Sequence, residues 1–270
     1  MNINSSYAGK VILAAAGPGD PELITVKALR YLQQADVVIA DRLVSEELLI
    51  NNVKAGAKLI YVGKQAGQQA STPQEEINQL LVHHAKDYHL IVRLKGGDVT
   101  FFSNVLDELK TLVNHGISFE IVPGVTAASG AAAYAGIPLT ARGYATAVRF
   151  LTYNHAVAWD ETSWEELAST NDTLVFYMST EWLNTLIDKL LENNISPEKY
   201  LMVIEQATTP FQNANLYRLK EYKERVALTR FISPTLIIIG KVVALHQKFQ
   251  WIKNNPTDQS YFKPVSECIE

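Results

Sequence analysis

The stretch from Val11 to Glu22, VILAAAGPGDPE, constrains the fold of this chain more than any other. An apolar run of strand length ends in Gly-Pro-Gly at positions 17–19, and Asp20-Pro21 can then cap and open a helix. Because glycine lacks a Cβ and tolerates positive φ, such a turn lets the backbone approach a ligand closely. The stretch predicts a binding loop between a strand and a helix.

The composition of this loop disfavours a dinucleotide. A nicotinamide fingerprint needs a third glycine near position 22, where Glu22 stands, and Pro18 removes an N–H that could hold a phosphate. Turns of this composition also occur as purely structural features, so the loop alone leaves both interpretations open.

The first half of the chain repeats a strand followed by a helix five times. The strands are expected at 11–16, 35–40, 58–62, 89–94 and 118–122, and the helices at 22–34, 45–50, 73–86, 104–115 and 127–136. This alternation predicts a mainly parallel sheet that is covered on both faces.

Polar residues follow each of these strands. They are Asp20, Asp41, Lys64, Asp98 and Thr126. The carboxyl ends of parallel strands meet at one edge, which is where open α/β sheets bind ligands. We expect the five loops to converge on one site, although loops are polar for other reasons too.

The second half of the chain does not repeat the regular alternation of one strand and one helix. Strands are expected at 148–152, 173–178, 200–205, 213–219 and 235–245, with a loop over 155–172. We expect an N-terminal α/β domain over 1–130, a C-terminal α/β domain over 131–250 and a tail over 251–270.

Composition excludes several classes of partner. The formal charge of −4, from 24 basic and 28 acidic residues, provides no global field for nucleic acid. The only cysteine, Cys268, excludes an internal disulfide and a cysteine-based metal site. No apolar run approaches the ~20 residues that cross a bilayer. The start MNINSSYAGK lacks the order of a signal peptide, so a cytoplasmic protein is expected.

Motifs for metal and hydrolytic chemistry are missing from the sequence. His83, His84 and His89 lie on or beside a predicted helix, but no cysteine or paired glutamate completes a ligand set. No GxSxG, Walker or HExxH motif occurs. No metal is expected.

Two residues at the predicted edge could transfer protons. Asp41 ends an apolar strand and could accept a proton, or it could simply cap the next helix. Lys64 follows Gly63 and could donate a proton or neutralise a carboxylate, or it could be an ordinary surface lysine.

The span from Gly9 to Leu245 resembles the S-adenosylmethionine-dependent tetrapyrrole methylases. The matching blocks are AAGPGDPELITVKAL, ADVVIADRLVS, VGKQAG, PQEEINQLL, RLKGGD, PGVTAASGAAAYAGIPLT, TLVFYM, QATTP and SPTLIIIGKVVAL. The resemblance implies two α/β domains with a ligand cleft between them, and a homodimer.

The resemblance also implies site residues. S-adenosyl-L-methionine would contact Pro18, Gly96, Gly97, Asp98, Phe101, Thr126, Ala127, Met178 and Ala207. Asp41 would be the proton acceptor and Lys64 the proton donor. An anionic tetrapyrrole in a net acidic protein needs local cations, and Arg42, Lys95 and Arg142 are the expected ones.

The implied activity is methylation of uroporphyrinogen III at C2 and C7, giving precorrin-2 for sirohaem or cobalamin synthesis. No dehydrogenase or chelatase domain is seen, so methylation alone is expected. Two stretches depart from the family pattern: residues 99–105 lack a Gly-Arg-Gly-Gly-Glu loop, and Ala141 replaces a histidine. Alternatives are therefore a methylase that acts on a later precorrin and an inactive homologue that binds the donor.

Overall fold

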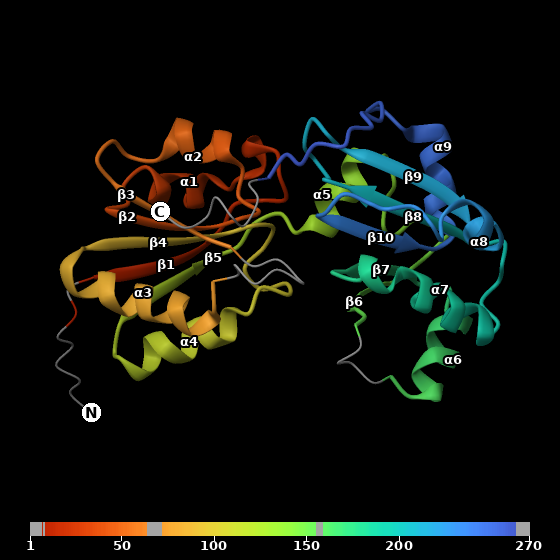
Figure 1. Ribbon diagram of the computed structural model, residues 1–270, viewed down its shortest axis with the longest axis horizontal. Coiled ribbons are helices and arrows are strands. Elements are labelled where there is room, and N and C mark those ends of the chain that lie inside the picture. Colours follow the sequence, from red (N-terminus) through yellow and green to blue (C-terminus); the bar gives the residue numbers. More distant parts are fainter. Residues whose placement is uncertain (1–6, 8, 64–71, 155–158, 263–270) are drawn as a thin grey trace. The chain divides into compact units, whose positions relative to one another are not determined.

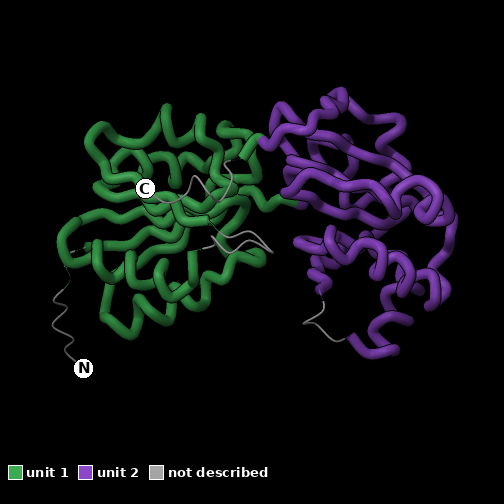
Figure 2. The backbone as a smooth tube through the Cα atoms, in the orientation of Figure 1, with its two compact units in different colours: residues 1–127, 261–270 green, residues 128–260 purple. Residues whose placement is uncertain are grey.

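The computed structural model describes residues 7, 9–63, 72–154 and 159–262, and the chain forms two compact units (Figures 1 and 2). The first unit contains the described residues up to Ala127, together with Tyr261 and Phe262. The second unit contains the described residues of the range 128–260.

The first unit is built on a five-stranded sheet in the order β3-β2-β4-β1-β5. Its strands are β1 (Lys10–Ala15), β2 (Val37–Asp41), β3 (Lys58–Val62), β4 (Leu90–Lys95) and β5 (Ser118–Val122). Every neighbouring pair is parallel. The prediction of a parallel sheet from the alternating pattern is confirmed.

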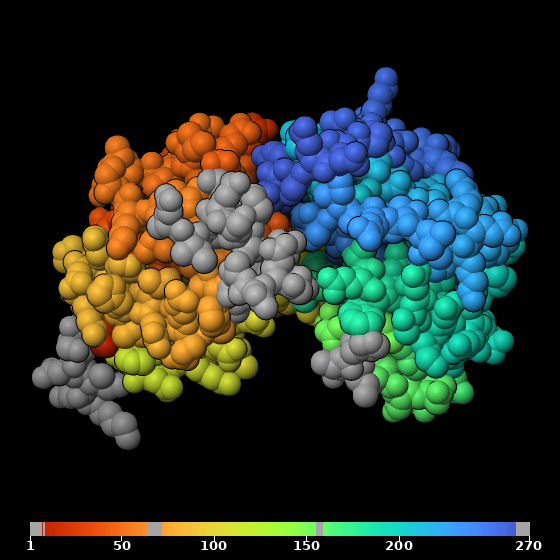
Figure 3. Space-filling view, in the orientation of Figure 1, coloured from red at the N-terminus to blue at the C-terminus, as the bar shows by residue number. Residues whose placement is uncertain are grey.

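Helices cover both faces of this sheet (Figure 1). They are α1 (Val26–Leu32), α2 (Glu46–Asn52), α3 (Gln74–Asp87) and α4 (Val105–Asn114). The apolar sides of α1 and α2 pack with Ile12 and Val38 on one face. Those of α3 and α4 pack with Leu13 and Ile39 on the other. In the space-filling view, the yellow to yellow-green atoms of the region around α3 and α4 form part of the outer surface of this unit (Figure 3).

The strand order creates a switch point between β1 and β4. These strands are neighbours, with Ala15 paired to Lys95 at their carboxyl ends. The chain leaves β1 for α1 on one face of the sheet and leaves β4 for α4 on the other face. Loops that diverge in this way open a crevice at the sheet edge, which is the usual ligand position in open α/β sheets.

The second unit contains a mixed sheet in the order β6-β7-β10-β8-β9. Its strands are β6 (Val148–Thr152), β7 (Thr173–Tyr177), β8 (Tyr200–Glu205), β9 (Asn213–Arg218) and β10 (Thr235–Ile239). Only β6 and β7 are parallel neighbours, and the other pairs are antiparallel. Since β7 and β8 both run against β10, their carboxyl ends lie at the same edge.

The second unit contains five helices among its described residues. They are α5 (Ala127–Tyr134, which begins in the first unit), α6 (Glu161–Ser169), α7 (Leu183–Glu192), α8 (Tyr222–Arg225) and α9 (His246–Phe249). Trp164 of α6 and Leu186 of α7 pack on Phe176 and Ile237 in the core of this unit. Four 3₁₀ turns complete the described elements: η1 (Pro21–Leu23), η2 (Thr180–Trp182), η3 (Leu219–Glu221) and η4 (Lys241–Leu245). Among the described residues, no helix has the length and apolarity to span a membrane.

Capping side chains explain two differences from the predicted elements. The helix expected over 22–34 is split, because the Asp20 carboxylate accepts the Glu22 N–H at 2.8 Å and holds η1, while Thr25 caps α1. The loop expected over 155–172 contains α6, which Asp160 caps by accepting the Ser163 N–H at 2.8 Å. That prediction was wrong.

The strand expected over 235–245 is also shorter. It ends at Ile239, and Gly240 donates its N–H to the Tyr200 carbonyl at 3.1 Å before η4 begins. The change of direction at this glycine replaces the second half of the predicted strand with a 3₁₀ turn.

The described part of the predicted tail packs on the second unit as far as Ser260. The Trp251 indole donates to the Ala133 carbonyl at 2.8 Å, and the Asn254 amide bonds the Ala214 carbonyl at 2.9 Å. Farther on, Tyr261 contacts Ser45 of the first unit, with 3.0 Å between their hydroxyl oxygens.

We predict that Gly136→Ala lowers the free energy of unfolding by about 3 kcal/mol. Gly136 has φ +67°, and an added Cβ would lie 2.1 Å from the Phe249 carbonyl oxygen, so left-handed strain and a backbone clash act together. Gly143, at φ +80° with nothing within 4 Å, is the matched control, and Gly143→Ala should cost only about 1 kcal/mol. Urea denaturation measures both, and equal losses would contradict the role of the Phe249 contact.

Candidate functional site

The loops after β1 and β4 are joined by a pair of backbone hydrogen bonds. Gly17 N–H donates to the Gly97 carbonyl at 3.1 Å, and Gly97 N–H donates back to the Gly17 carbonyl at 2.7 Å. Both glycines have positive φ, +80° and +69°. The Gly-Pro-Gly turn and the Gly-Gly-Asp turn therefore form one structure at the switch point, as the sequence predicts for converging loops.

Asp98 connects this structure to the loop after β5. One carboxylate oxygen accepts the Thr100 N–H at 2.8 Å, and the other accepts the Gly124 N–H at 2.7 Å. A Cβ at Gly124 would lie 2.5 Å from the Cβ of Ala15, so only glycine allows this approach. Asp98 is buried, and its carboxylate links its own loop to the loop after β5.

The loop after β2 also reaches this edge. A Cβ at Gly96 would lie 2.8 Å from the Leu43 carbonyl oxygen, which shows how closely the two loops pack. At Gly97 the nearest atom to an added Cβ is the Ala127 nitrogen, at 3.8 Å. Gly97 thus leaves space where a ligand could contact the backbone.

The predicted donor-binding residues of the first unit lie on these loops. Pro18, Gly96, Gly97, Thr126 and Ala127 are half-buried. Phe101, which follows the Gly-Gly-Asp turn, is 37% exposed.

Beneath this edge lies a cluster of four charged side chains. The fully buried Arg93 donates through Nε to Glu108 at 2.9 Å and through Nη2 to Asp41. Lys95 donates to both oxygens of Glu108 at 2.9 Å. Asp41 ends β2 and keeps 31% of its side chain exposed. Two cations and two carboxylates therefore balance, and Asp41 is the member of the cluster that a ligand could reach.

Burial and the neighbouring carboxylates shift the pKa of Arg93 in opposite directions. Burial would lower the pKa of Arg93, but the charges of Asp41 and Glu108 outweigh it and raise the pKa. Burial and the Arg93 charge lower the pKa of Lys95 below its ordinary value. Arg93 stays cationic at any pH where the fold persists and fixes the Asp41 carboxylate in place.

The expected substrate-binding cations lie in different settings. Lys95 is buried, and its ammonium bonds Glu108, so its charge acts inside the first unit. Arg42 is also buried, with 8% of its surface exposed. Arg142 of the second unit is exposed, in the turn closed by the Ala141–Ala145 bridge. Lys64, the expected proton donor, lies outside the described residues.

Arg93 and Glu108 were missed by the sequence reasoning. Their signal was present, because Arg93 and Lys95 alternate in an apolar strand and so share one face of it. Two cations on a covered face require an acid in the covering helix, and Glu108, four residues before the buried Leu112, is in the right place.

The second unit brings Met178 and Ala207 to one edge of its sheet. Met178 follows β7 and is 63% exposed, and Ala207 follows β8 and is buried. The N terminus of α5 is tied to the same edge, since the Ala128 N–H donates to the Tyr177 hydroxyl at 3.0 Å.

Backbone strain marks the same loops. Non-glycine residues with positive φ among the described residues are Phe102, Asn104, Met178, Asn194, Gln206 and Thr208. All but Asn194 lie in the loop after the Gly-Gly-Asp turn or in the loops after β7 and β8. Such conformations persist only where the surrounding structure holds them, and they cluster at functional sites.

The described residues contain no group of three or more His, Cys, Asp or Glu side chains that could hold a metal ion. The edge of the first unit offers close backbone contact with a ligand at Gly97 beside the oriented carboxylate of Asp41.

Comparison with known proteins connects these features to one family. The family model of the tetrapyrrole (corrin/porphyrin) methylases matches residues 10–222. A siroheme synthase of Vesicomyosocius okutanii is 44% identical over 255 residues, which are 94% of this chain and 54% of that protein. The chain thus spans about half the length of the curated relatives it matches.

Two solved structures of Thermus thermophilus have the same fold. The native form of a uroporphyrin III C-methyltransferase is 36% identical, with a TM-score of 0.73 over 88% of this chain and 100% of that chain. A uroporphyrin-III C-methyltransferase complexed with S-adenosylhomocysteine is 35% identical, with a TM-score of 0.72 over 88% of this chain and 94% of that chain. The two-unit α/β fold predicted from the sequence is confirmed.

We predict that Glu108→Gln lowers the free energy of unfolding by about 3 kcal/mol, because it keeps the side-chain shape but leaves Arg93 and Lys95 buried with one carboxylate fewer. Urea denaturation at neutral pH measures the loss. Glu76→Gln on the exposed surface of α3 is the control and should stay within about 0.5 kcal/mol. Equal denaturation midpoints for the two variants would show that the cluster does not stabilise the fold.

Proposed function

Because the chain belongs to the tetrapyrrole (corrin/porphyrin) methylases, we propose that it transfers methyl groups from S-adenosyl-L-methionine to C2 and C7 of uroporphyrinogen III and forms precorrin-2. The observation that carries the proposal is the joined pair of glycine turns beside Asp41, within a fold similar to that of a methyltransferase crystallised with the demethylated donor.

The edge of the first unit fits the methyl donor. The uncrowded backbone at Gly97 and the half-buried Pro18 and Thr126 suit close backbone contact with a compact adenosine and amino-acid group. Both carboxylate oxygens of Asp98 already accept hydrogen bonds from backbone N–H groups, one from Thr100 and one from Gly124, so Asp98 cannot turn both oxygens toward a ligand. We assign it the role of keeping the turns in the binding geometry. When bound, the donor supplies an electrophilic methyl group.

The second unit contributes the other donor contacts in this proposal. Met178 and Ala207 lie at one edge of their sheet, next to the strained Gln206 and Thr208. A backbone held in an uncommon conformation by its own unit presents fixed carbonyl and N–H groups, which saves the entropy of ordering them on binding.

Asp41 is proposed to accept the ring proton that must leave after the methyl group has been added, since the methylated carbon itself becomes quaternary and carries no proton. Its carboxylate is partly exposed, and Arg93 fixes its orientation. Methyl transfer itself requires alignment of the acceptor carbon with the methyl group more than it requires a strong base. Asp41 therefore acts after the bond has formed, with Lys64 as the proposed proton donor.

The carboxylates of the acceptor require cations, and we propose Arg142 as the principal one. It is exposed and presents a planar fork of donors that can bind a carboxylate through two hydrogen bonds. Arg42 is proposed to assist it. Lys95 is proposed to act only through its ion pair with Glu108, beneath the site.

The test of the function is to offer uroporphyrinogen III and later precorrins separately with isotopically labelled donor. We expect two labelled methyl groups on uroporphyrinogen III, measured by mass spectrometry. Label only on a later precorrin would overturn the proposed acceptor and favour a later methylase. Donor binding without label on any tetrapyrrole would instead indicate an inactive binding protein.

For Asp41→Asn we predict nearly normal donor affinity and turnover lowered by about 10² or more, the usual scale for losing a positioned acid or base. Asparagine keeps the shape and can still accept the Arg93 hydrogen bond, so the fold should remain. Single-turnover kinetics and donor calorimetry measure the two effects. Turnover within a few-fold of the original would mean that the proton leaves to water.

We also propose that the protein is a homodimer, since this accompanies the family resemblance. Multi-angle light scattering should then give twice the mass of one chain. A mass equal to that of one chain across the micromolar range would reject the dimer.

A further inference from the structure

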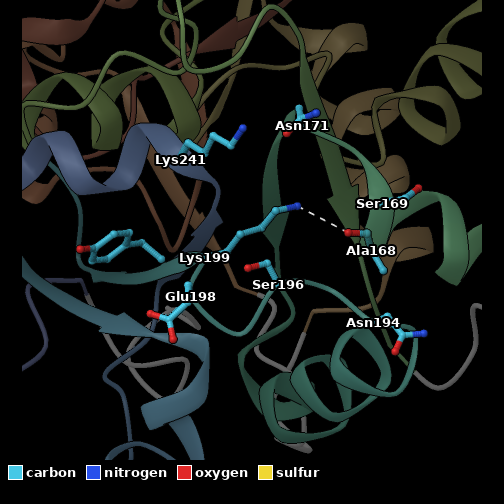
Figure 4. A pocket seen from close by; sticks show the side chains of 9 residues that line it. Ala168, Ser169, Asn171, Asn194, Ser196, Glu198, Lys199 and Lys241 are labelled. Carbon is cyan, nitrogen blue, oxygen red and sulfur yellow. Dashed lines mark hydrogen bonds between the residues drawn. The ribbon is translucent and has the colours of Figure 1, made fainter.

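A cavity of about 490 Å³ opens in the second unit (Figure 4). It is lined by Asn171 just before β7, Tyr200 at the start of β8 and Lys241 just after β10. Because β10 runs against β7 and β8, these three positions share the sheet edge opposite Met178 and Ala207. The volume lies in the range of small-molecule sites.

Two lysines line this cavity. Lys199 is half-buried and donates to the Thr170 carbonyl at 2.7 Å and, more weakly, to the Ala168 carbonyl at 3.5 Å. Lys241 is exposed at the start of η4. Within the described part of the chain, no salt bridge joins either lysine to a carboxylate. An ammonium has three donors, so both lysines have donors left for a ligand.

The acidic residue of the lining does not cancel these charges. Glu198 accepts from Arg218 at 2.6 Å and from Lys220 at 2.8 Å. Figure 4 shows its carboxylate turned away from the ammonium groups of Lys199 and Lys241. Because two other cations already neutralise Glu198, the cavity itself carries positive charge.

The two lysines repel each other. Burial lowers the pKa of Lys199, and the charge of Lys241 lowers it further. The carbonyl end of α6 would disfavour an anion, but Lys199 already bonds the carbonyls of Ala168 and Thr170 there. An anion placed between the ammonium groups would relieve the repulsion.

We propose that this cavity binds the phosphate group of a small metabolite between Lys199 and Lys241. A phosphate monoester is close to a dianion at neutral pH and so matches two ammonium groups, which a monocarboxylate does not. The hydroxyl group of Ser196 and the amide of Asn171 also line the cavity and can bond phosphate oxygens or the rest of the molecule.

Titration calorimetry with inorganic phosphate at constant ionic strength tests the proposal. We expect saturable binding that Lys241→Met weakens about tenfold, while Lys248→Met, which removes an exposed lysine of α9 outside the cavity, leaves it within twofold. Lys241 is exposed, and no hydrogen bond or salt bridge joins its side chain to another described residue, so this variant should fold. Acetate at the same ionic strength should bind at least tenfold more weakly.

Amine labelling gives an independent measurement. Peptide mass spectrometry after brief acylation should show that phosphate slows the reaction at Lys199 and Lys241, which line the cavity, and leaves the reaction at Lys248 unchanged. Equal phosphate affinity in the Lys241→Met and original proteins, equal affinity for acetate, or no protection of Lys199 would each overturn the proposal. None of these measurements depends on methyl transfer.

Discussion

The close approach of two backbones at Gly17 and Gly97 is the constraint on which the rest of the first unit depends. Reciprocal hydrogen bonds of 3.1 and 2.7 Å between these glycines bring the turns after β1 and β4 together at the switch point. Asp98 extends the contact to Gly124, and Gly96 extends it to Leu43. Side chains at Gly96 and Gly124 would separate the loops, because an added Cβ would lie 2.8 and 2.5 Å from neighbouring atoms, while Gly17 and Gly97 have positive φ that other residues rarely adopt. The backbone geometry of these turns therefore shapes this edge of the sheet, and side chains such as Asp98 mainly hold the loops together.

A buried, electrically balanced cluster supports this edge from below. Arg93 reaches Asp41 and Glu108 at once, and Lys95 completes the balance. Buried ion pairs add little to stability compared with well-packed apolar residues, so their presence favours a functional explanation. The cluster holds one partly exposed carboxylate in a fixed direction without requiring solvent to rearrange, which is the property that a proton acceptor needs.

Much of the first unit could be predicted because its strands are apolar, bounded by glycine turns and separated by helices with one apolar face. The loop residues Asp41 and Asp98 could be placed at the edge for the same reason. The alternation of Arg93 and Lys95 indicated that an acid was needed in the covering helix, but the pairing of Arg93 with Glu108, fifteen residues away, depends on how that helix packs on the strand. In the second unit, α6 was missed because Asp160 was taken for a loop residue and its cap was not recognised. Short helices depend on caps and packing more than on periodicity.

The strand order has a consequence for how the protein is made. Lys10 at the start of β1 pairs with Leu90 of β4 and with Ser118 of β5, so β1, which lies between these strands, has no partner until most of the first unit has been synthesised. Long-range parallel pairing slows folding and leaves an apolar strand exposed in the meantime. The apolar segment 11–16 must therefore be kept from aggregating during translation. The strands β2 and β3 are close in sequence, so they are the pair that can form first. The interval in which a chaperone would be most useful ends when β5 leaves the ribosome.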